Sequence, residues 1–166
     1  MGENSKENAL PAWDAPTLAL CPSTDDERVT QWTLCANTWG SDGIEEFVEA
    51  ERRLATQLGI ETGGIRHWIL VDTAEDVQPG QQRTILSSCE NLRRRAVYSY
   101  DDNGSRKVED TTCYGVAAVH CPKEYRGRGY GRRLSTEIGR LLRADIPNFG
   151  LETCLFSVLY SGVGAV

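Results

Sequence analysis

The sequence predicts an α+β or α/β domain, and three observations support this fold class. Apolar runs of strand length are bounded by turn residues, while other segments repeat their apolar residues at helical spacing. A glycine- and arginine-rich loop joins one apolar strand directly to an amphipathic helix. With 166 residues, of which 40% are hydrophobic and 25% charged, the chain has the size of one domain with a real core.

The first part of the chain divides into a tail and the start of the domain. Residues 1–16 show little pattern, so we expect a flexible tail before a domain that spans 17–166. A short strand is expected at 18–21. Ser23 or Thr24, followed by acidic residues, is typical of a helix N-terminus.

Two helices are expected next. The first ends near residue 37, and the second runs from about Ser41 to Gly59 with its apolar residues at helical spacing. The large aromatic side chains of both helices are expected in the core and not in a ligand site: Trp32, Trp39 and Phe47.

The second half begins with strands and ends with a helix and a last strand. Strands are expected at 67–72, 83–89, 96–100 and 113–121, with a turn at 101–104. A helix from about Gly129 to Arg143 places four apolar residues on one face: Leu134, Ile138, Leu141 and Leu142. A last strand is expected at 155–160.

The loop before that helix carries the strongest functional signal. Glycines alternate at Gly127, Gly129 and Gly131, and glycine lets a backbone take positive φ and approach a ligand closely. The first N–H groups of a helix have no intrahelical partner, and the helix dipole makes that end positive. A strand, glycine loop and helix in this order therefore predict a phosphate site. Four arginines add positive charge: Arg126, Arg128, Arg132 and Arg133.

Charge is distributed unevenly along the chain, whose net charge is −6. Residues 1–62 contain twelve acidic and four basic residues, whereas 120–143 contain seven basic and two acidic ones. A basic segment of this size within an acidic protein indicates a small polyanionic ligand and argues against nucleic acid. One solvated basic helix face is the alternative explanation.

The spacing of the loop discriminates among phosphate-binding motifs. The pattern G-x-x-x-x-G-K-[ST] is absent, and in G-x-G-x-x-G the third glycine would fall on Arg132. The pattern R-x-x-G-x-G fits, as Arg126, Gly129 and Gly131. This segment resembles the pyrophosphate-binding signature of the GNAT acyl-CoA N-acyltransferases.

The resemblance implies a GNAT fold, a mixed and mostly antiparallel sheet flanked by helices. Residues 116–131 and 156–164 are most similar to the fungal lysine N-acetyltransferase-like branch. Family members continue after this point with another helix and two strands. We therefore expect a domain that is truncated after the fifth strand, with its C-terminal part missing.

The same resemblance implies a function and a set of ligand contacts. It implies an acetyl-CoA-dependent N-acetyltransferase that acts on a primary amine, with lysine or a similar small amine as candidates. The alternative is a catalytically impaired fragment that binds coenzyme A without turnover. By resemblance the cofactor contacts are Ala118, Val119, His120, Cys121, Arg126, Gly127, Arg128, Gly129, Tyr130, Gly131 and Arg132, with an amide near Val119 at the thioester oxygen.

The proton-transfer groups remain open at this stage. His120 lies beside the expected thioester site and is a candidate base. A packing role, at a place where family members have an aromatic residue, is the explanation we favour. Tyr160 is a candidate leaving-group acid, and a core or interface role explains it as well.

The remaining expectations concern compartment and partners. The six cysteines form no C-x-x-C pair, so we expect free thiols and no metal site. No apolar run approaches the ~20 residues that cross a bilayer, and the N-terminus lacks a signal-peptide pattern. We expect a cytoplasmic protein whose partners are acetyl-CoA and an amine, without nucleic acid or membrane. A dimer partner or a missing C-terminal half would cover the exposed sheet edge.

Overall fold

The computed structural model describes residues 10–40, 43–59, 63–143 and 154–159. They form a five-stranded sheet with the strand order β1-β2-β3-β4-β5. The first four strands are antiparallel to their neighbours, and β5 is parallel to β4. The mixed, mostly antiparallel sheet predicted from the sequence is confirmed. In chain order the elements are β1 (Leu18–Pro22), α1 (Asp25–Trp39), α2 (Ile44–Gln57), β2 (Ile65–Asp72), β3 (Ser87–Asp102), β4 (Ser105–His120), the 3₁₀ turn η1 (Lys123–Tyr125), α3 (Tyr130–Arg143) and β5 (Phe156–Leu159).

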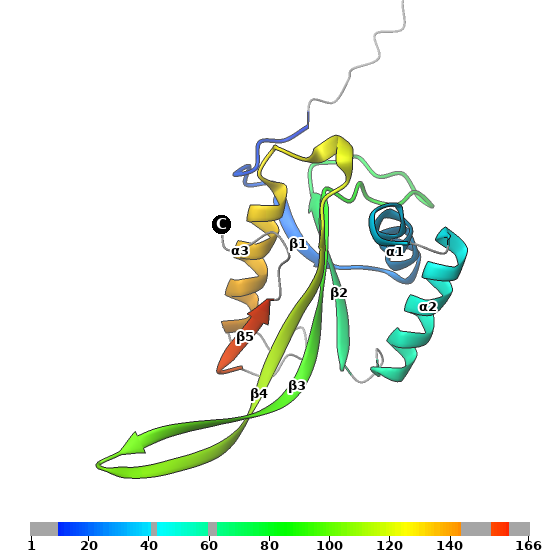
Figure 1. Ribbon diagram of the computed structural model, residues 1–166. Coiled ribbons are helices and arrows are strands. Elements are labelled where there is room, and N and C mark those ends of the chain that lie inside the picture. The colour runs from blue at the N-terminus through cyan, green and yellow to red at the C-terminus, as the bar shows by residue number, and fades with distance from the viewer. Residues whose placement is uncertain (1–9, 41–42, 60–62, 144–153, 160–166) are drawn as a thin grey trace, which may run out of the picture.

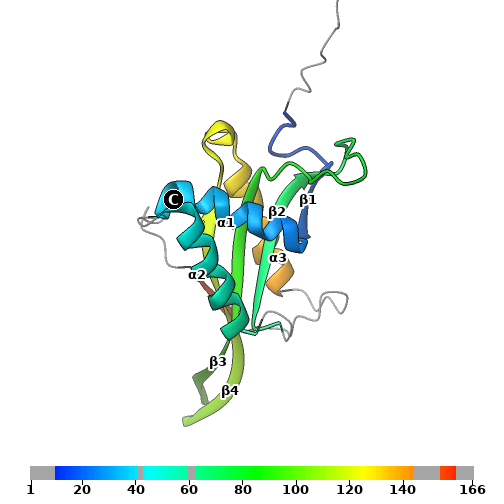
Figure 2. The same ribbon diagram turned by 90° about the vertical axis from the view of Figure 1, so that its right-hand side faces the viewer.

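Helices cover both faces of the sheet. Helix α3 packs on one face, while α1 and α2 lie on the other, as Figures 1 and 2 show from two sides. The predicted apolar face of α3 is confirmed, because its residues are buried against Trp68, Leu70 and Tyr114 of the sheet. On the opposite face Trp32 and Ala55 pack with Ile65. Each face of the sheet therefore has its own hydrophobic layer, and the strands run between them.

Helix α1 begins at a capping box. The Thr24 hydroxyl accepts a hydrogen bond from the Glu27 amide at 3.3 Å, and the Glu27 carboxylate accepts one from the Thr24 amide at 2.9 Å. The same carboxylate receives two 2.6 Å hydrogen bonds from the guanidinium of Arg83. Of the two predicted caps, Thr24 is the one used. Arg83 ties the start of the helix to the segment before β3.

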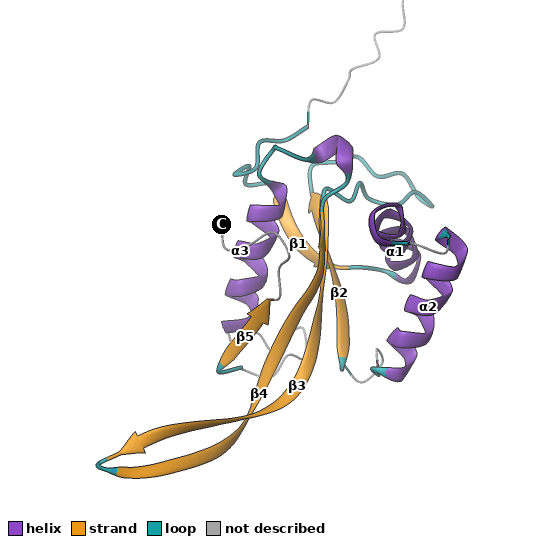
Figure 3. Ribbon diagram, viewed as in Figure 1, coloured by secondary structure: helices purple, strands orange, loops and turns teal. Residues whose placement is uncertain are grey.

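The longest strands depart from the prediction. Strand β3 begins at Ser87 and not at residue 83, and β4 begins at Ser105 and not at residue 113. The predicted turn is confirmed, with positive φ at Asn103 and Gly104 between the two strands. The hairpin continues well past the other strands (Figure 3). The predicted strand at 96–100 is confirmed as part of β3, but the polar sequence did not indicate that the ladder continues without a break from residue 90 to the turn.

The N-terminal segment departs from the expected tail in its last residues. Leu10 and Ala15 pack against the core, and the Tyr130 hydroxyl donates a hydrogen bond to the Pro11 carbonyl. The side chain of Trp13 lies against the glycine loop, with its Cβ 2.9 Å from the position that a Cβ on Gly129 would take. Residues 10–16 therefore belong to the surface around the predicted phosphate site.

Candidate functional site

The glycine loop has the backbone geometry that its sequence predicts. Gly127 has φ +74° and Gly129 has φ +86°, a region that side chains with a Cβ rarely adopt. A Cβ added at Gly127 or Gly131 would meet no atom within 4 Å, so the space beside both residues is open. The loop thus presents bare backbone at Gly127 and Gly131, as close approach of a ligand requires, while the Trp13 side chain lies against Gly129.

The amides of this loop are available for a ligand. No hydrogen bond to another described residue uses the amides from Gly127 to Arg132, whereas the Arg133 amide already bonds the Gly129 carbonyl at 3.0 Å. Six consecutive donors therefore precede or open α3, where the helix dipole is positive. This arrangement can bind a phosphate or diphosphate through the backbone alone.

Three arginines surround these amides in different ways. The Arg126 Nε donates to the Cys121 carbonyl at 2.9 Å, which ties the loop back to the end of β4. Arg132 lies over the ring of Trp13 with its guanidinium carbon 5.3 Å from the ring centroid. Arg128 is exposed. All three add positive charge beside the loop, and an exposed guanidinium can pair with phosphate oxygens through its fork.

Strand β4 is irregular just before the loop. Glu90 pairs with Ala117 and Ser88 with His120, so Ala118 and Val119 together face Cys89 in a β-bulge. Ala118 has φ +49°, which is uncommon for a residue with a side chain and marks local strain. In the described part of β5, pairing with β4 ends at Val116 and Leu159. The bulge therefore lies beyond the last pair that β4 forms with the described part of β5.

His120 ends β4 and is almost fully buried. Its Nε2 lies 3.2 Å from the Thr38 hydroxyl, and its ring makes an edge contact with Trp39 at a centroid distance of 5.6 Å. Burial lowers its pKa, and Arg126 lowers it further, against a smaller opposite effect of Glu124. His120 is therefore neutral near pH 7. Its Nδ1 is buried without a hydrogen-bond partner in the described part of the chain.

Of the remaining predicted site residues, the structure describes Val119 and Cys121. Val119 and Cys121 are half-buried against the core, and the Cys121 thiol contacts the Leu86 carbonyl at 3.3 Å. Burial raises the pKa of Cys121, so it is a thiol and not a nucleophilic thiolate. Tyr160, the predicted acid, lies outside the described residues.

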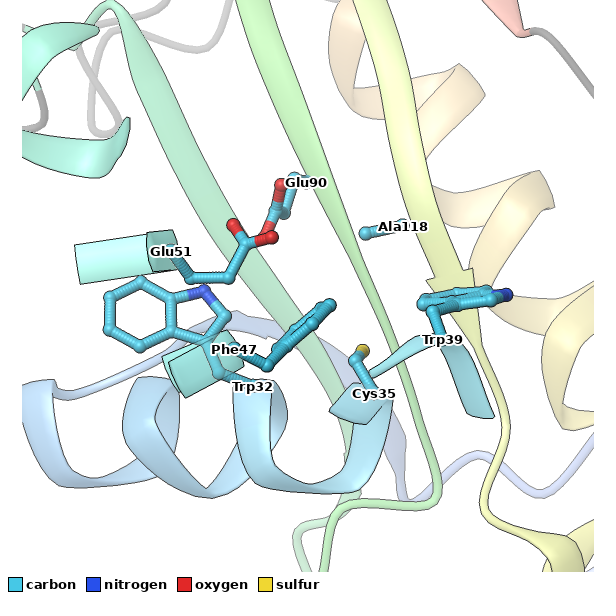
Figure 4. Close-up of a pocket in the computed structure, with 7 residues that line it drawn as sticks. All are labelled: Trp32, Cys35, Trp39, Phe47, Glu51, Glu90 and Ala118. Atoms are coloured by element: carbon cyan, nitrogen blue, oxygen red, sulfur yellow. The ribbon is translucent and has the colours of Figure 1, made fainter. Parts of the chain in front are cut away.

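A cavity of about 310 Å³ lies beside the bulge, on the face of the sheet covered by α1 and α2. Figure 4 shows its lining residues, which come from both helices and from β3 and β4: Trp32, Cys35, Trp39, Phe47, Glu51, Glu90 and Ala118. The prediction that these aromatic residues belong to the core is confirmed for Trp32, which packs with Ala55 and Ile65, and is wrong for Trp39. Trp32 is buried, but Trp39 is 48% exposed, because it ends α1 at the edge of the cavity.

Sequence reasoning missed two carboxylates in this cavity. Glu51 lies one helical turn after Phe47, which places both on one face of α2, and Glu90 is buried on β3. Burial, followed by repulsion from Glu90, raises the pKa of Glu51. Burial and both carboxylates raise the pKa of the Cys35 thiol to about 12, so Cys35 is no nucleophile. No spacing in the sequence connects Glu51 on α2 with Glu90 on β3.

Two classes of site find no support in the described residues. No group of three His, Cys, Asp or Glu side chains is placed to hold a metal ion there. None of the described helices combines the length and the apolar composition that a membrane span needs.

Comparisons with known proteins bear on the fold. No protein-family model matches the sequence, and no curated protein matches it. Among solved structures, a possible acetyltransferase from Clostridium difficile 630 superposes with a TM-score of 0.53 at 13% identity, over 87% of this chain and 80% of that one. Glucosamine-6-phosphate N-acetyltransferase from Arabidopsis thaliana gives 0.50 at 13% identity, over 89% and 84%. A transcriptional regulator from Bacillus halodurans C-125 gives 0.53 at 11% identity, over 87% and 81%.

The chain has the GNAT fold. At these identities the likeness concerns the fold alone, and the GNAT resemblance read from the sequence is supported at that level. In this fold the end of β4 connects the two features. Ala118 of the bulge lines the cavity, and the glycine loop follows β4 and leads into α3.

Proposed function

We propose that this protein transfers the acetyl group of acetyl-CoA to a primary amine. The amides of Gly127–Arg132, which make no hydrogen bond to another described residue, carry the proposal, because they offer six backbone donors and a positive helix end to a diphosphate. The fold shared with a solved N-acetyltransferase supports the same class of reaction.

In this proposal the diphosphate of coenzyme A binds the loop, with Arg126 and Arg128 beside it. The pantetheine arm pairs with the β4 edge beyond Val116, where backbone groups are open and an extended ligand can add to the sheet. The thioester then lies at the bulge of Ala118 and Val119. An amide near Val119 donates to the thioester oxygen and stabilises the negative charge that develops during attack.

The transfer itself needs a neutral amine. The amine nitrogen attacks the thioester carbonyl carbon, the C–N bond forms, the C–S bond breaks, and the coenzyme A thiolate takes up a proton. His120 is the proposed acceptor of the ammonium proton, because burial keeps its imidazole neutral and able to accept. Tyr160 remains the predicted donor to the thiolate.

Two measurements test this function on the whole chain. Isothermal titration with acetyl-CoA, and with NAD as the control diphosphate, should give binding of acetyl-CoA only. A free-thiol assay over a panel of primary amines should then give amine-dependent release of coenzyme A. If acetyl-CoA does not bind, the proposal fails. If it binds and no amine stimulates release, the chain is a coenzyme A-binding module without turnover.

A further inference from the structure

The cavity between α1, α2 and the sheet has a chemistry of its own. Three aromatic side chains and two carboxylates line it, together with Cys35 and Ala118, and no lysine or arginine is among the lining residues. In Figure 4 the carboxylates of Glu51 and Glu90 point toward each other, Phe47 lies between them and α1, and Trp39 lies at the end of α1 near Ala118. Aromatic faces beside carboxylates are the surroundings that organic cations favour.

Among the described residues, no lysine or arginine forms an ion pair with either carboxylate. The Glu90 side chain is only 8% exposed, and its described ionic contact is the buried His67, whose Nε2 lies 3.2 Å from Oε1. Glu51 reaches the same cavity from α2 and is repelled by Glu90, which contributes to its raised pKa. A cation placed between the two carboxylates would remove this repulsion.

A second and independent feature of the cavity points to a ligand. Trp32 is 2% exposed, and its indole N–H has no hydrogen-bond partner among the described residues. Figure 4 shows this nitrogen on the side of the ring turned toward Glu51. A buried donor without a partner is costly, so such a group in a cavity wall indicates that something else completes its hydrogen bond.

We propose that this cavity is the acceptor site and that it selects an aliphatic amine in its ammonium form. The positive charge lies between Glu51 and Glu90, and the alkyl part of the ligand packs against Trp32, Phe47 and Trp39. Ala118 belongs both to the cavity wall and to the bulge, so an amine bound here lies beside the proposed thioester site. This role as acceptor site rests on the proposed function, whereas cation binding by the cavity does not.

The same chemistry predicts what the cavity rejects. An anionic acceptor would face two carboxylates, and a neutral alcohol of equal length would gain only the aromatic packing. Selection therefore depends on charge more than on shape. The cavity is at the small end of ligand pockets, which agrees with one short aliphatic chain.

Binding of n-pentylammonium, with 1-pentanol as its neutral counterpart, tests the proposal without acetyl-CoA. Titration is followed by calorimetry and by the fluorescence of Trp32 and Trp39. The wild type should bind the ammonium ion at least about tenfold more tightly than the alcohol. Glu51→Gln and Glu90→Gln should each weaken ammonium binding about tenfold and leave alcohol binding unchanged. Equal binding of both probes, or unchanged ammonium binding in both variants, would overturn it.

Glu49→Gln is the matched control, because Glu49 lies on α2 outside the cavity, where it contacts Arg52 and Arg53. It should leave ammonium binding unchanged, and a loss as large as in Glu51→Gln would mean that general charge, not this cavity, attracts the ligand. In the acetyl-transfer assay the Glu51 variant should raise the KM for the amine and leave the Kd for acetyl-CoA unchanged. Failure of the wild type to bind acetyl-CoA would count against the proposed function, whereas equal binding of the ammonium ion and the alcohol by the wild type would count against this inference.

Discussion

The glycine loop and the cavity differ in charge, in enclosure and in how the chain builds them. The loop is an exposed run of consecutive residues with unpaired amides and arginines. The cavity is lined by side chains from four elements, and two of these side chains are carboxylates. One region suits an anion and the other a cation, and the bulge of β4 lies between them along the chain. This difference in charge is what the proposed binding of an anionic cofactor and a cationic acceptor requires.

The largest expected effect comes from a carboxylate placed within the loop. Gly131→Glu introduces a side chain where a Cβ meets no atom within 4 Å and where φ is not positive, so the fold tolerates it. The negative charge would occupy the amide site, and the Kd for acetyl-CoA should rise about 100-fold, or roughly 3 kcal/mol. Calorimetric titration measures this change, while n-pentylammonium binding should remain as in the wild type.

Gly139→Glu is the control for this variant. It is the same substitution in the same helix, two turns farther along, and its nearest neighbour is the Arg143 guanidinium at 3.9 Å. Acetyl-CoA affinity should stay within about twofold of the wild type. Equal loss in both variants would mean that overall charge, and not the loop, decides cofactor binding.

Substitution of His120 distinguishes a role as catalytic base from a role in packing. Its folded-state pKa lies below the ordinary 6.5, so it is neutral at pH 7, and kcat/KM should fall only when the pH drops below about 6.5 and the ring is protonated. Replacement by phenylalanine keeps a ring against Trp39 but removes the base. We expect His120→Phe to lose about 100-fold in kcat together with the acidic limb of the pH profile. Retained activity in this variant would assign His120 to packing.

The smallest expected effect concerns stability. The folded-state pKa of Glu51 is raised above its ordinary value of 4.5, so folding favours the protonated form. Its contribution to stability is fully present below pH 4.5 and is lost as the pH rises through the raised pKa. Glu51→Gln should therefore stabilise the protein at pH 7, by less than about 1 kcal/mol because the site is partly exposed, and should give no gain at pH 4. Thermal unfolding at both pH values, with Glu49→Gln as reference, measures the difference.

The loop could be predicted because its function depends on neighbours in the sequence. Positive φ at Gly127 and Gly129, free amides, and a helix that starts at Tyr130 all follow from a few consecutive residues. The apolar face of α3 was equally predictable, since helical spacing alone places Leu134 and Ile138 together. The limits of β3 and β4 were not, because the polar arm pairs through its backbone rather than through an apolar pattern.

The cavity could not be predicted by the same means. Trp32 and Phe47 are large apolar residues, and such residues are most often buried in the core. Their position in the cavity wall depends on how α1 and α2 pack against the sheet. The pairing of Glu51 with Glu90 likewise joins residues from a helix and a strand that no local pattern connects.

The amino-acid order by itself determined the phosphate loop, the helix that follows it and the mixed α and β character of the chain. Backbone conformation and helix ends are set by residues within one or two turns of each other. Tertiary packing alone decided the bulge at Ala118, the exposure of Trp39 and the meeting of two carboxylates beside aromatic rings. These features depend on contacts between segments that are distant in the sequence. The relative geometry of such segments is fixed only when the core is packed.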